Sequence, residues 1–534
     1  MMKPDELIAK AQSERRSALT EAEADVNPLI IGPDGRVTAV DALVILGDKT
    51  KRAPGQKRCD LSFLDAMLAP KRIAVVGAKR ASDDSWQNLM VIIKNFGYEG
   101  RLYPINPGAE EIEGLRAYPD LVSLPEKMDL VIISIPAPRV PAALEDCIAS
   151  GNRNVHIFTA GFKETGEEEG IKLQRDIEEI AQRGGLHVIG PNCMGIYNPE
   201  IKLTTWIPAP VKSGPVAFVS QSGGHTGDLV LYAEQFGIHF SKAISYGNAL
   251  TLDSTDFLEY LARDDETKII ALYLEGVRDG SKLLRQVTEI NRTKPIIVMK
   301  GGLTESGART VASHTGSLAG REHIWEAFFR QSGAVKVSSL EEMTDVILAF
   351  LRLGHPRGNR VGIIGAGGGM AVSSADTFAR AGLEIPTLME ETIGKLRDFI
   401  PAAGNFMRNP VDAGIAFSDL ALLERALRIL SADPHIDMIV VNIPFDWFFD
   451  AVPGGYMDKL SRYLGGPARE HTSGKPFAVN YRRYRSNSGI KEAEASFQRR
   501  LIESGVPVYN NLSRAAFALA SVAEYYGFQR DHQR

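Results

Sequence analysis

The stretch ARTVASHTGSLAG, residues 308 to 320, places one histidine, His314, among small, hydroxylated and glycine residues. It lacks the periodicity of a helix or strand that would bury the ring. Neutral imidazole is a competent nucleophile at pH 7, so an exposed histidine beside phosphate-binding groups can accept a phosphoryl group. Taken alone, the pattern is more typical of a solvated loop histidine. Its function depends on which companions the fold brings to it.

Two other segments carry groups suited to that chemistry. Glu275 ends the apolar run IIALYLE, and a carboxylate there could hydrogen-bond the second ring nitrogen of the histidine and fix its tautomer. The segment SQSGGHTGD from Ser220 joins a strand to a helix, and its amides and hydroxyls could surround a phosphoryl group. A tight turn without a ligand is the alternative. His225, within the helix, is expected to be a packing or surface residue.

A further glycine turn follows the run IAVVG. After Gly77 it continues with Lys79 and Arg80 in place of the glycines of a dinucleotide fingerprint. The turn is a weak signal for a nucleotide, although a helix start with a nearby lysine can bind phosphate; a turn that binds nothing is the alternative. The loops YPINP, IPAP, TAGFKETG and GPNCMG mostly follow strands. They should therefore collect at the carboxyl edge of a sheet, where open α/β sheets bind ligands.

The sequence repeats one pattern of elements that can position these residues. Apolar β-branched runs alternate with amphipathic helical segments, which is typical of parallel sheets covered on both faces, so the fold class is α/β. The runs are residues 73–77, 129–136, 215–220, 269–275, 295–300, 360–365 and 437–444. The turns after Val216 and Val361 look like an internal repeat, since each following helix carries an aspartate, Asp228 or Asp376.

Residues 1 to 50 do not follow that pattern. The stretch NPLIIGPDGRVTAVDALVIL predicts a strand, a GPDGR turn and a second strand, which is a β-hairpin. Two strands alone are marginally stable in water, so this hairpin needs another sheet. The neighbouring sequence does not supply one.

The bulk properties narrow the class of protein. With 534 residues, we expect about three or four domains, with boundaries near residues 60, 200 and 355. The composition is 44% hydrophobic and 24% charged, and the net charge of −5 argues against a nucleic-acid surface. No apolar run reaches the length of a membrane span, and the N-terminus lacks the apolar segment of a signal peptide. Cys59, Cys147 and Cys193 are too far apart to suggest a disulfide framework or a metal site. We therefore expect a soluble cytoplasmic protein.

From residue 63 to about 520, the chain resembles the alpha side of the nucleoside-diphosphate-forming acyl-CoA synthetases, relatives of succinyl-CoA synthetase. The matching motifs, in order, are VVGA, YPINP, IPAP, AGFKETG, GPNCMG, SQSGG, YGN, LYLEGVRDG, SHTGSLAG and RNPVD. The resemblance implies a linker over residues 51–62, a CoA-binding Rossmann-like domain over 63–199, and two flavodoxin-like domains over 200–354 and 355–534.

The resemblance also implies roles for individual residues. His314 matches the histidine that relays phosphate between the nucleotide and the acyl phosphate, and Glu275 matches the glutamate that supports it. Gln221, Ser222 and Gly223 fall at the helix start that holds the phosphoryl group. The positions where CoA lies in the family are Gly77, Ala78, Lys79, Asn106, Pro136, Ala160, Gly161 and Asn192.

Residues 1–50 are similar to the closing segment of an ATP-grasp domain, and most of that domain is missing from the chain. In that segment Asn27 and Asp41 match the residues that hold Mg²⁺, and both offer the oxygen ligands that this ion prefers. The resemblance therefore implies a partner chain of ATP-grasp type, in a hetero-oligomer such as α2β2. The alternative is a vestigial segment that binds no partner.

The implied activity is that of an acid–thiol ligase using CoA, ATP or another nucleoside triphosphate, and Mg²⁺. The alternatives are a CoA-binding scaffold or sensor without catalysis, and an acyl or carbamoyl transferase on the same fold. The turn GAGGGM over 365–370 departs from the NAGGPG-like turn of relatives, and Lys79 stands where serine is common. The acid is not determined by the sequence. The aromatic candidates for the lining of its pocket, with a place in the core as the alternative, are Trp206, Tyr246, Phe445 and Trp447.

Overall fold

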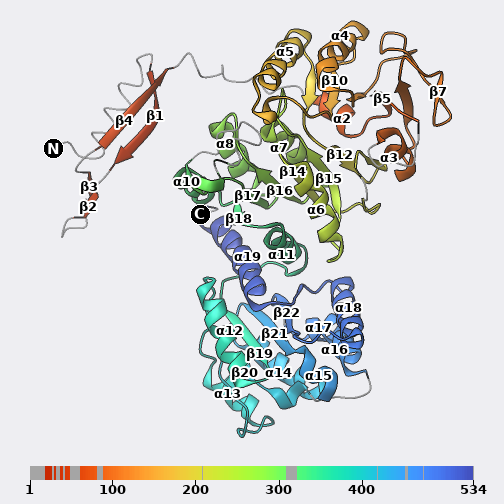
Figure 1. The fold of residues 1–534 in the computed structure, drawn as a ribbon. Coiled ribbons are helices and arrows are strands. Elements are labelled where there is room, and N and C mark those ends of the chain that lie inside the picture. The colour runs from red at the N-terminus through yellow and green to blue at the C-terminus, as the bar shows by residue number, and fades with distance from the viewer. Residues whose placement is uncertain are drawn as a thin grey trace. The chain divides into compact units, whose positions relative to one another are not determined.

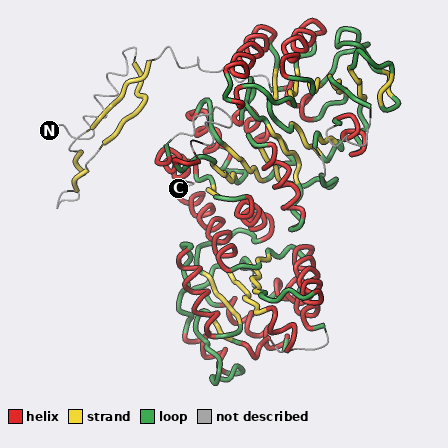
Figure 2. Tube along the Cα trace, in the orientation of Figure 1, coloured by secondary structure: helices red, strands yellow, loops and turns green. Residues whose placement is uncertain are grey.

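The structure is a computed structural model. It describes residues 19–26, 29–31, 37–39, 42–48, 61–80, 88–206, 209–307, 309, 321–417, 419–451, 455–472 and 474–532. The chain divides into two compact units, Met1–Leu61 and Ser62–Arg534. Figure 1 labels many of the elements of both units, and Figure 2 shows the helices flanking the strands of the second unit.

The first unit contains two antiparallel strand pairs. β1 pairs with β4, and β2 pairs with β3. Their bounds are Leu19–Val26, Ala42–Asp48, Leu29–Ile31 and Val37–Ala39, respectively. Asn27 and Asp41 lie outside the described residues. The assignment of residues 1–50 to a hairpin from an ATP-grasp domain stays a prediction.

The first large sheet has five parallel strands in the order β11-β10-β9-β5-β6. In that order the strands are His187–Ile189, Asn154–Ile157, Leu130–Ile133, Arg72–Val76 and Arg101–Ile105. The helices of this region are α2 (Ser62–Leu68), α3 (Leu89–Phe96), α4 (Val140–Ser150) and α5 (Glu168–Gly184). All four residues of β9 are buried, because helices cover both faces of a parallel sheet.

The second large sheet has seven strands in the order β13-β12-β15-β14-β16-β17-β18. In that order they are Leu203–Thr204, Gly195–Asn198, Phe240–Ser245, Val216–Ser220, Ile269–Leu274, Ile296–Lys300 and Val335–Val337. β12 runs antiparallel to both of its neighbours, and the strands from β15 to β18 are parallel. The helices are α6 (Gly223–Glu234), α7 (Ser254–Arg263), α8 (Gly280–Ile290), α10 (Glu322–Ser332) and α11 (Leu340–Arg352).

The third large sheet has five parallel strands in the order β20-β19-β21-β22-β23. In that order they are Val411–Asp412, Val361–Gly365, Met438–Pro444, Phe477–Arg482 and Val508–Tyr509. The helices are α12 (Gly368–Arg380), α13 (Glu390–Arg397), α14 (Leu420–Ala432), α15 (Phe445–Ala451), α16 (Tyr456–Gly465), α17 (Pro467–Glu470), α18 (Ser488–Glu503) and α19 (Leu512–His532). The predicted α/β class and the seven predicted apolar strands are confirmed.

A shared core connects the second and third sheets. α19 packs along α11, and one cluster of buried side chains includes Val346 of α11, Leu519 of α19 and Val440 of β21. At the edge of this core Arg514 makes a bidentate ion pair with the buried carboxylate of Asp345, at 2.5 and 2.9 Å. The sequence-predicted domain boundaries stay predictions.

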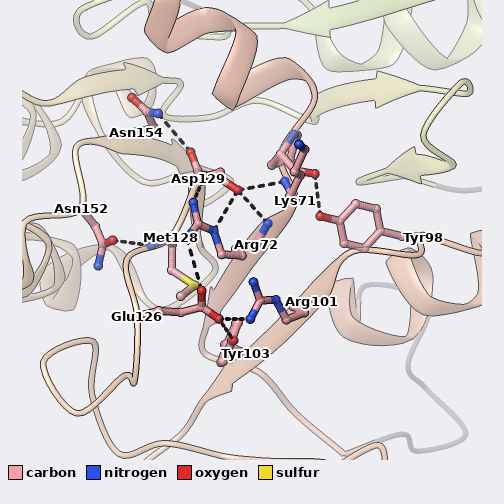
Figure 3. Close-up of polar contacts among 11 residues, drawn as sticks. Lys71, Arg72, Tyr98, Arg101, Tyr103, Glu126, Met128, Asp129, Asn152 and Asn154 are labelled. Carbon is pink, nitrogen blue, oxygen red and sulfur yellow. Dashed lines mark hydrogen bonds and ion pairs between the residues drawn. The ribbon is translucent and has the colours of Figure 1, made fainter.

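An arginine–aspartate pair closes the amino ends of two neighbouring strands in both five-stranded sheets. In the first sheet Arg72, which opens β5, donates to Asp129, which precedes β9, at 2.7 and 3.2 Å (Figure 3). In the third sheet Arg360 precedes β19 and donates to Asp437 before β21, at 2.8 Å to each oxygen. The first and third sheets therefore repeat one construction, which the sequence comparison of the second and third turns did not identify.

Within the described part of the chain, no helix has both the length and the apolar character needed to cross a bilayer.

Candidate active site at two sheet edges

The five turns implicated in CoA binding lie at one edge of the first sheet. Each follows the carboxyl end of a different strand, and the strands are parallel, so the turns are neighbours. The residues in these turns are Gly77, Ala78 and Lys79 after β5, Asn106 after β6, Pro136 after β9, Ala160 and Gly161 after β10, and Asn192 after β11. Lys79, Pro136 and Ala160 are exposed at this edge. The structure thus brings together all eight residues predicted to contact CoA.

Gly77 makes the turn after β5 possible. Its φ of +87° is a left-handed conformation that favours glycine, and an added Cβ would lie 2.3 Å from the carbonyl oxygen of Ser134. Asn106 links this turn to its neighbour, because its Nδ2 donates to the Ala78 carbonyl at 2.8 Å and its Oδ1 accepts from Gly108 N at 2.8 Å. The backbone amides and small side chains of these turns fit the close approach of an extended ligand.

The turn after β10 is fixed by the carboxylate of Glu164. Its Oε1 accepts the backbone N–H groups of Gly161 and Phe162, at 2.6 and 3.1 Å. Gly161 has a φ of +109°, and a Cβ there would lie 3.2 Å from the Cβ of Ala137. Ala137 begins the short 3-10 helix Ala137–Arg139, which Pro136 precedes. The turns after β9 and β10 are therefore in direct contact.

Asn248 joins this edge to the carboxyl edge of the second sheet. It follows β15, and its Nδ2 donates to Glu164 Oε2 at 2.6 Å and to Gln174 Oε1 at 3.2 Å. Its backbone N–H donates to the carbonyl of Pro191 at 3.0 Å. Asn192, the next residue, has a φ of +56°, a conformation that asparagine tolerates better than most residues. The edge predicted to bind CoA and the edge predicted to bind phosphate are thus hydrogen-bonded to each other.

The helix start on the second sheet is built around Ser222. Ser222 is the N-cap of α6, and its hydroxyl accepts from the backbone of His225 at 3.3 Å. Gly223 opens the helix, and a Cβ there would lie 2.6 Å from Cγ of Met194, so the GPNCMG loop packs against this helix end. The ring of His225 lies on Tyr273, with centroids 4.5 Å apart. The half-buried ring thus packs on Tyr273, and its Nδ1 lies 3.4 Å from the Ser222 hydroxyl; the expectation that His225 is a packing or surface residue and takes no part in the chemistry stays a prediction.

Glu275 is buried, with 4% of its surface exposed, and it forms hydrogen bonds with three other residues. The side-chain oxygen of Gln221 accepts the backbone N–H groups of Glu275 and Gly276, the second at 2.9 Å. Lys300 Nζ donates to the Glu275 carbonyl at 2.9 Å. Tyr273 Oη donates to the carboxylate at 3.2 Å. Burial of the phenol raises the pKa of Tyr273, which keeps it a donor.

His314 lies outside the described residues, and its pairing with Glu275 stays a prediction. Glu275 directly follows β16, which pairs with β14, so it lies near the turn from β14 to α6, at the strand end that the sequence predicted. The structure thus assembles the described members of the predicted phosphoryl site, Gln221, Ser222, Gly223 and Glu275, at one edge.

The glycine turn of the third sheet is already occupied by a carboxylate. Gly367, the N-cap of α12, donates its backbone N–H to Asp412 Oδ1 at 2.8 Å. A carboxylate at a helix start takes the position that an anionic ligand would favour. This contact gives a physical reason why the GAGGGM turn differs from the helix start at Ser222.

Three of the four aromatic residues suggested for an acyl pocket belong to the core. Trp206, Tyr246 and Phe445 have at most 3% of their surface exposed, whereas Trp447 is 57% exposed on α15. The indole of Trp206 packs on Gly227 and Tyr197. The core alternative is therefore confirmed for the first three residues.

Four residues of this arrangement were not identified from the sequence: Tyr273, Asn248, Glu164 and Lys300. Each belongs to one of the motifs or runs described above. Tyr273 lies in LYLEG, Asn248 in YGN, Glu164 in AGFKETG and Lys300 in the run PIIVMK. Their position just before or after the end of a strand was the available signal. Their partners lie far away in the sequence, and this is why pattern alone could not assign them.

Comparison with known proteins identifies the family. Residues 71–199 match the family model of a CoA binding domain, and residues 213–350 match that of a succinyl-CoA ligase like flavodoxin domain. Acetate–CoA ligase [ADP-forming] II subunit alpha of Pyrococcus furiosus is 37% identical over 470 residues, which cover 87% of this chain and 99% of that protein. The chain belongs to the ADP-forming acyl-CoA ligase family. The family predicted from the sequence motifs is thus confirmed.

Other members of the ADP-forming acyl-CoA ligases match over a similar part of this chain. Acetate–CoA ligase [ADP-forming] I of Archaeoglobus fulgidus is 36% identical over 463 residues, which cover 86% of this chain. This chain spans 64% of the length of that relative. The dinucleotide forming acetyl-coenzyme A synthetase 1 of Candidatus Korarchaeum cryptofilum, solved with phosphate and ADP, superimposes with a TM-score of 0.74 at 31% identity, covering 88% of this chain and 98% of that one.

Proposed function

We propose that this chain is the alpha-type subunit of an enzyme that converts a carboxylic acid, CoA and ATP to acyl-CoA, ADP and phosphate. The observation that supports it best is the contact of Asn248 with Glu164, which places the edge carrying Gly77 and Gly161 beside the edge carrying Glu275. A ligase of this class needs CoA and the phosphoryl group within reach of one acyl carbon, and adjoining edges provide that arrangement.

The proposed chemistry has three steps. A ring nitrogen of His314 attacks the terminal phosphorus of ATP, and ADP leaves. A carboxylate oxygen of the acid then attacks that phosphorus, which forms the acyl phosphate and frees the imidazole. Finally the thiolate of CoA attacks the acyl carbon, and inorganic phosphate leaves. Because free carboxylate is a poor electrophile, dividing its activation into two phosphoryl transfers replaces one difficult step with easier ones.

The described residues have distinct tasks in this scheme. Glu275 accepts a hydrogen bond from the second ring nitrogen of His314 and fixes its tautomer. Ser222 and Gly223 present the start of α6 to the phosphoryl oxygens, where the helix dipole and backbone N–H groups stabilise negative charge. CoA lies along the turns that contain Gly77 and Gly161. Gln221 orients Glu275 in addition to lining the phosphoryl site.

The nucleotide site requires a second chain in this proposal. Asn27 and Asp41 are the residues of this chain that would hold Mg²⁺, through oxygen atoms. A partner of ATP-grasp type would supply the remainder of the nucleotide site, in a hetero-oligomer such as α2β2. The relative from Pyrococcus furiosus is named a subunit alpha, which supports this division.

The direct test is phosphorylation of the full chain in the reverse direction. The chain is incubated with acetyl-CoA and ³²P-labelled phosphate, and in a second tube with an aromatic acyl-CoA. We expect an acid-labile, alkali-stable label on His314 that is absent in H314N. Binding of CoA without any label, in the presence of either thioester, would instead favour a CoA-binding scaffold. Acyl transfer that proceeds fully in H314N would favour a transferase.

The partner is tested by co-purification and reconstitution. The chain is isolated from its own cells, the polypeptide that accompanies it is added back, and nucleoside diphosphate release is followed with a set of acids. Release by the mixture and not by the chain alone is expected. Equal rates for the chain alone and for the mixture would refute the requirement for a partner.

A further inference from the structure

Lys300 ends β17 and is almost fully enclosed, with 6% of its surface exposed. Its ammonium group donates to the carbonyl of Glu275 at 2.9 Å and also to the carbonyl of Gly301. It lies over the indole of Trp325, 5.0 Å from the ring centroid. One positive charge therefore connects the lysine's own segment, at the end of β17, with the end of β16 and with α10.

The three segments are those from which the proposed reaction is built. Gly301 precedes His314 in the sequence and Trp325, on α10, follows it. Glu275 is the carboxylate proposed to support the histidine. We propose that Lys300 is a positioning residue for phosphoryl transfer, holding the backbone of Glu275 and the chain on both sides of His314 in one arrangement. This inference rests on the proposed phosphohistidine chemistry.

Burying the ammonium group of Lys300 costs free energy that burying an apolar side chain would not cost. Removing it from water is unfavourable, and here burial lowers the pKa of Lys300 to about 8 while the nearby charge of Glu275 opposes that shift. Carbonyl oxygens and an aromatic face offset the lost hydration. An apolar side chain of similar length could pack there with no such cost, so the directed hydrogen bonds are the property that a lysine adds.

The same strand provides a matched control. Lys294 lies just before the amino end of β17, and its Nζ also donates to two carbonyl oxygens, those of Leu261 and Asp264, each at 2.7 Å. Burial lowers the pKa of Lys294 as well. Lys294 has the same kind of contacts as Lys300, but at the other end of the strand from Glu275. Comparing variants of Lys300 and Lys294 distinguishes an effect on the position of the site from an effect on the stability of the fold.

The experiment compares K300M, K300R and K294M in the full chain, with K300Q in place of K300M if the latter does not fold. Three quantities are measured: the rate of ³²P labelling with acetyl-CoA and phosphate, the dissociation constant for CoA, and the rate of trypsin cleavage after the exposed Arg309. For K300M we expect labelling slowed about tenfold or more, since a displaced catalytic group is costly, with CoA affinity unchanged. K300R should recover part of the rate, and K294M should label as the wild type does.

The cleavage assay is independent of catalysis. Since Lys300 connects the start of the segment that contains Arg309 to Glu275 and Trp325, its loss should speed cleavage after Arg309 several-fold, whereas K294M should not. Wild-type labelling and cleavage rates in K300M would overturn the inference, as would equal effects of K300M and K294M. If the wild type takes no label, the proposed function fails. Unchanged cleavage would then refute the anchoring by Lys300, and faster cleavage would retain the anchoring alone.

Discussion

The side-chain oxygen of Gln221 accepts the backbone N–H groups of Glu275 and its neighbour Gly276 across two adjacent strands. Gln221 belongs to the turn proposed to hold a phosphoryl group, and Glu275 to the strand end proposed to hold the histidine. One amide side chain therefore fixes the separation between the two groups. A substitution at Gln221 should therefore lower the rate of phosphoryl transfer more than it lowers the stability of the fold.

Replacing Gln221 by leucine removes the acceptor of the buried N–H group of Glu275 and of the partly buried N–H group of Gly276. We expect Q221L to lower the rate of histidine phosphorylation by about 100-fold, as for a displaced catalytic group, while CoA affinity changes little. Labelling with ³²P and calorimetric CoA titration measure the two effects. Q182L, at an exposed position on α5, is the control. Wild-type labelling by Q221L would contradict the assigned role.

The contact between the first two sheets can be tested at Asn248. N248A removes donors to Glu164 and Gln174, and we expect it to cost about 1 to 2 kcal/mol of unfolding free energy. N248D places a second carboxylate 2.6 Å from Glu164, so it should destabilise more than N248A. Urea unfolding gives the free energies, and calorimetry gives the accompanying loss of CoA affinity. An N248D protein as stable as the wild type would show that the contact is unimportant.

Gly77 lies close to the backbone carbonyl of Ser134, and the need for a glycine there can be tested with Gly114 as the control. Both Gly77 and Gly114 have left-handed φ values, +87° and +76°, but a Cβ at Gly114 would meet nothing within 4 Å. G114A should cost about 1 kcal/mol for the backbone conformation alone. G77A should cost about 1 to 3 kcal/mol beyond that, because its Cβ meets the Ser134 carbonyl, and it should weaken CoA binding. Equal costs for the two variants would exclude the steric explanation.

The pair of Arg72 and Asp129 predicts how stability depends on pH. Burial raises the pKa of Asp129, but hydrogen bonds from the Arg72 side chain and the Lys71 backbone outweigh that effect and hold it below its usual value. A lowered folded-state pKa stabilises the protein above the unfolded pKa of about 4, and the contribution is lost as pH falls through the folded value. D129N should therefore cost about 1 to 3 kcal/mol at pH 7 and progressively less below pH 4.

Urea unfolding between pH 3 and pH 7 measures this difference. The control is E99Q, because Glu99 pairs with Lys202 on the surface, where 79% and 49% of the two side chains are exposed. Exposed pairs contribute little to stability, so E99Q should unfold as the wild type does. A D129N deficit that stayed constant with pH would contradict the electrostatic explanation.

The strands were predictable because burial on both faces leaves a continuous apolar run, as in IIALYL of β16. The edge that gathers Gly77, Asn106 and Asn192 was predictable too, since loops that follow parallel strands share an edge. The roles of Lys300 and Asn248 were not, because Glu164 lies 84 residues from Asn248 and Glu275 lies 25 residues from Lys300. Contacts over such separations leave no local period in the sequence.

The internal repeat illustrates the same limit. The glycine turns predicted a repeat between the second and third sheets. The shared arginine–aspartate pairs instead relate the first sheet to the third. The segments MDLVIISIP and IDMIVVNIP, from residues 128 and 436, carry that relationship in the sequence. The importance of their aspartates became visible only once Arg72 and Arg360 were seen to contact them.

These two ion pairs lie at the amino ends of their strands, while the ligand turns of the first sheet lie at the opposite ends. In the first sheet the ion pair and the turns proposed to bind ligand thus lie at opposite ends of the strands. Loops at the carboxyl ends of the strands can be lengthened, shortened or exchanged with little effect on the arginine–aspartate pair at the amino ends. Directed evolution of the proposed ligase toward other acids should therefore begin with the loops at the carboxyl ends of the strands.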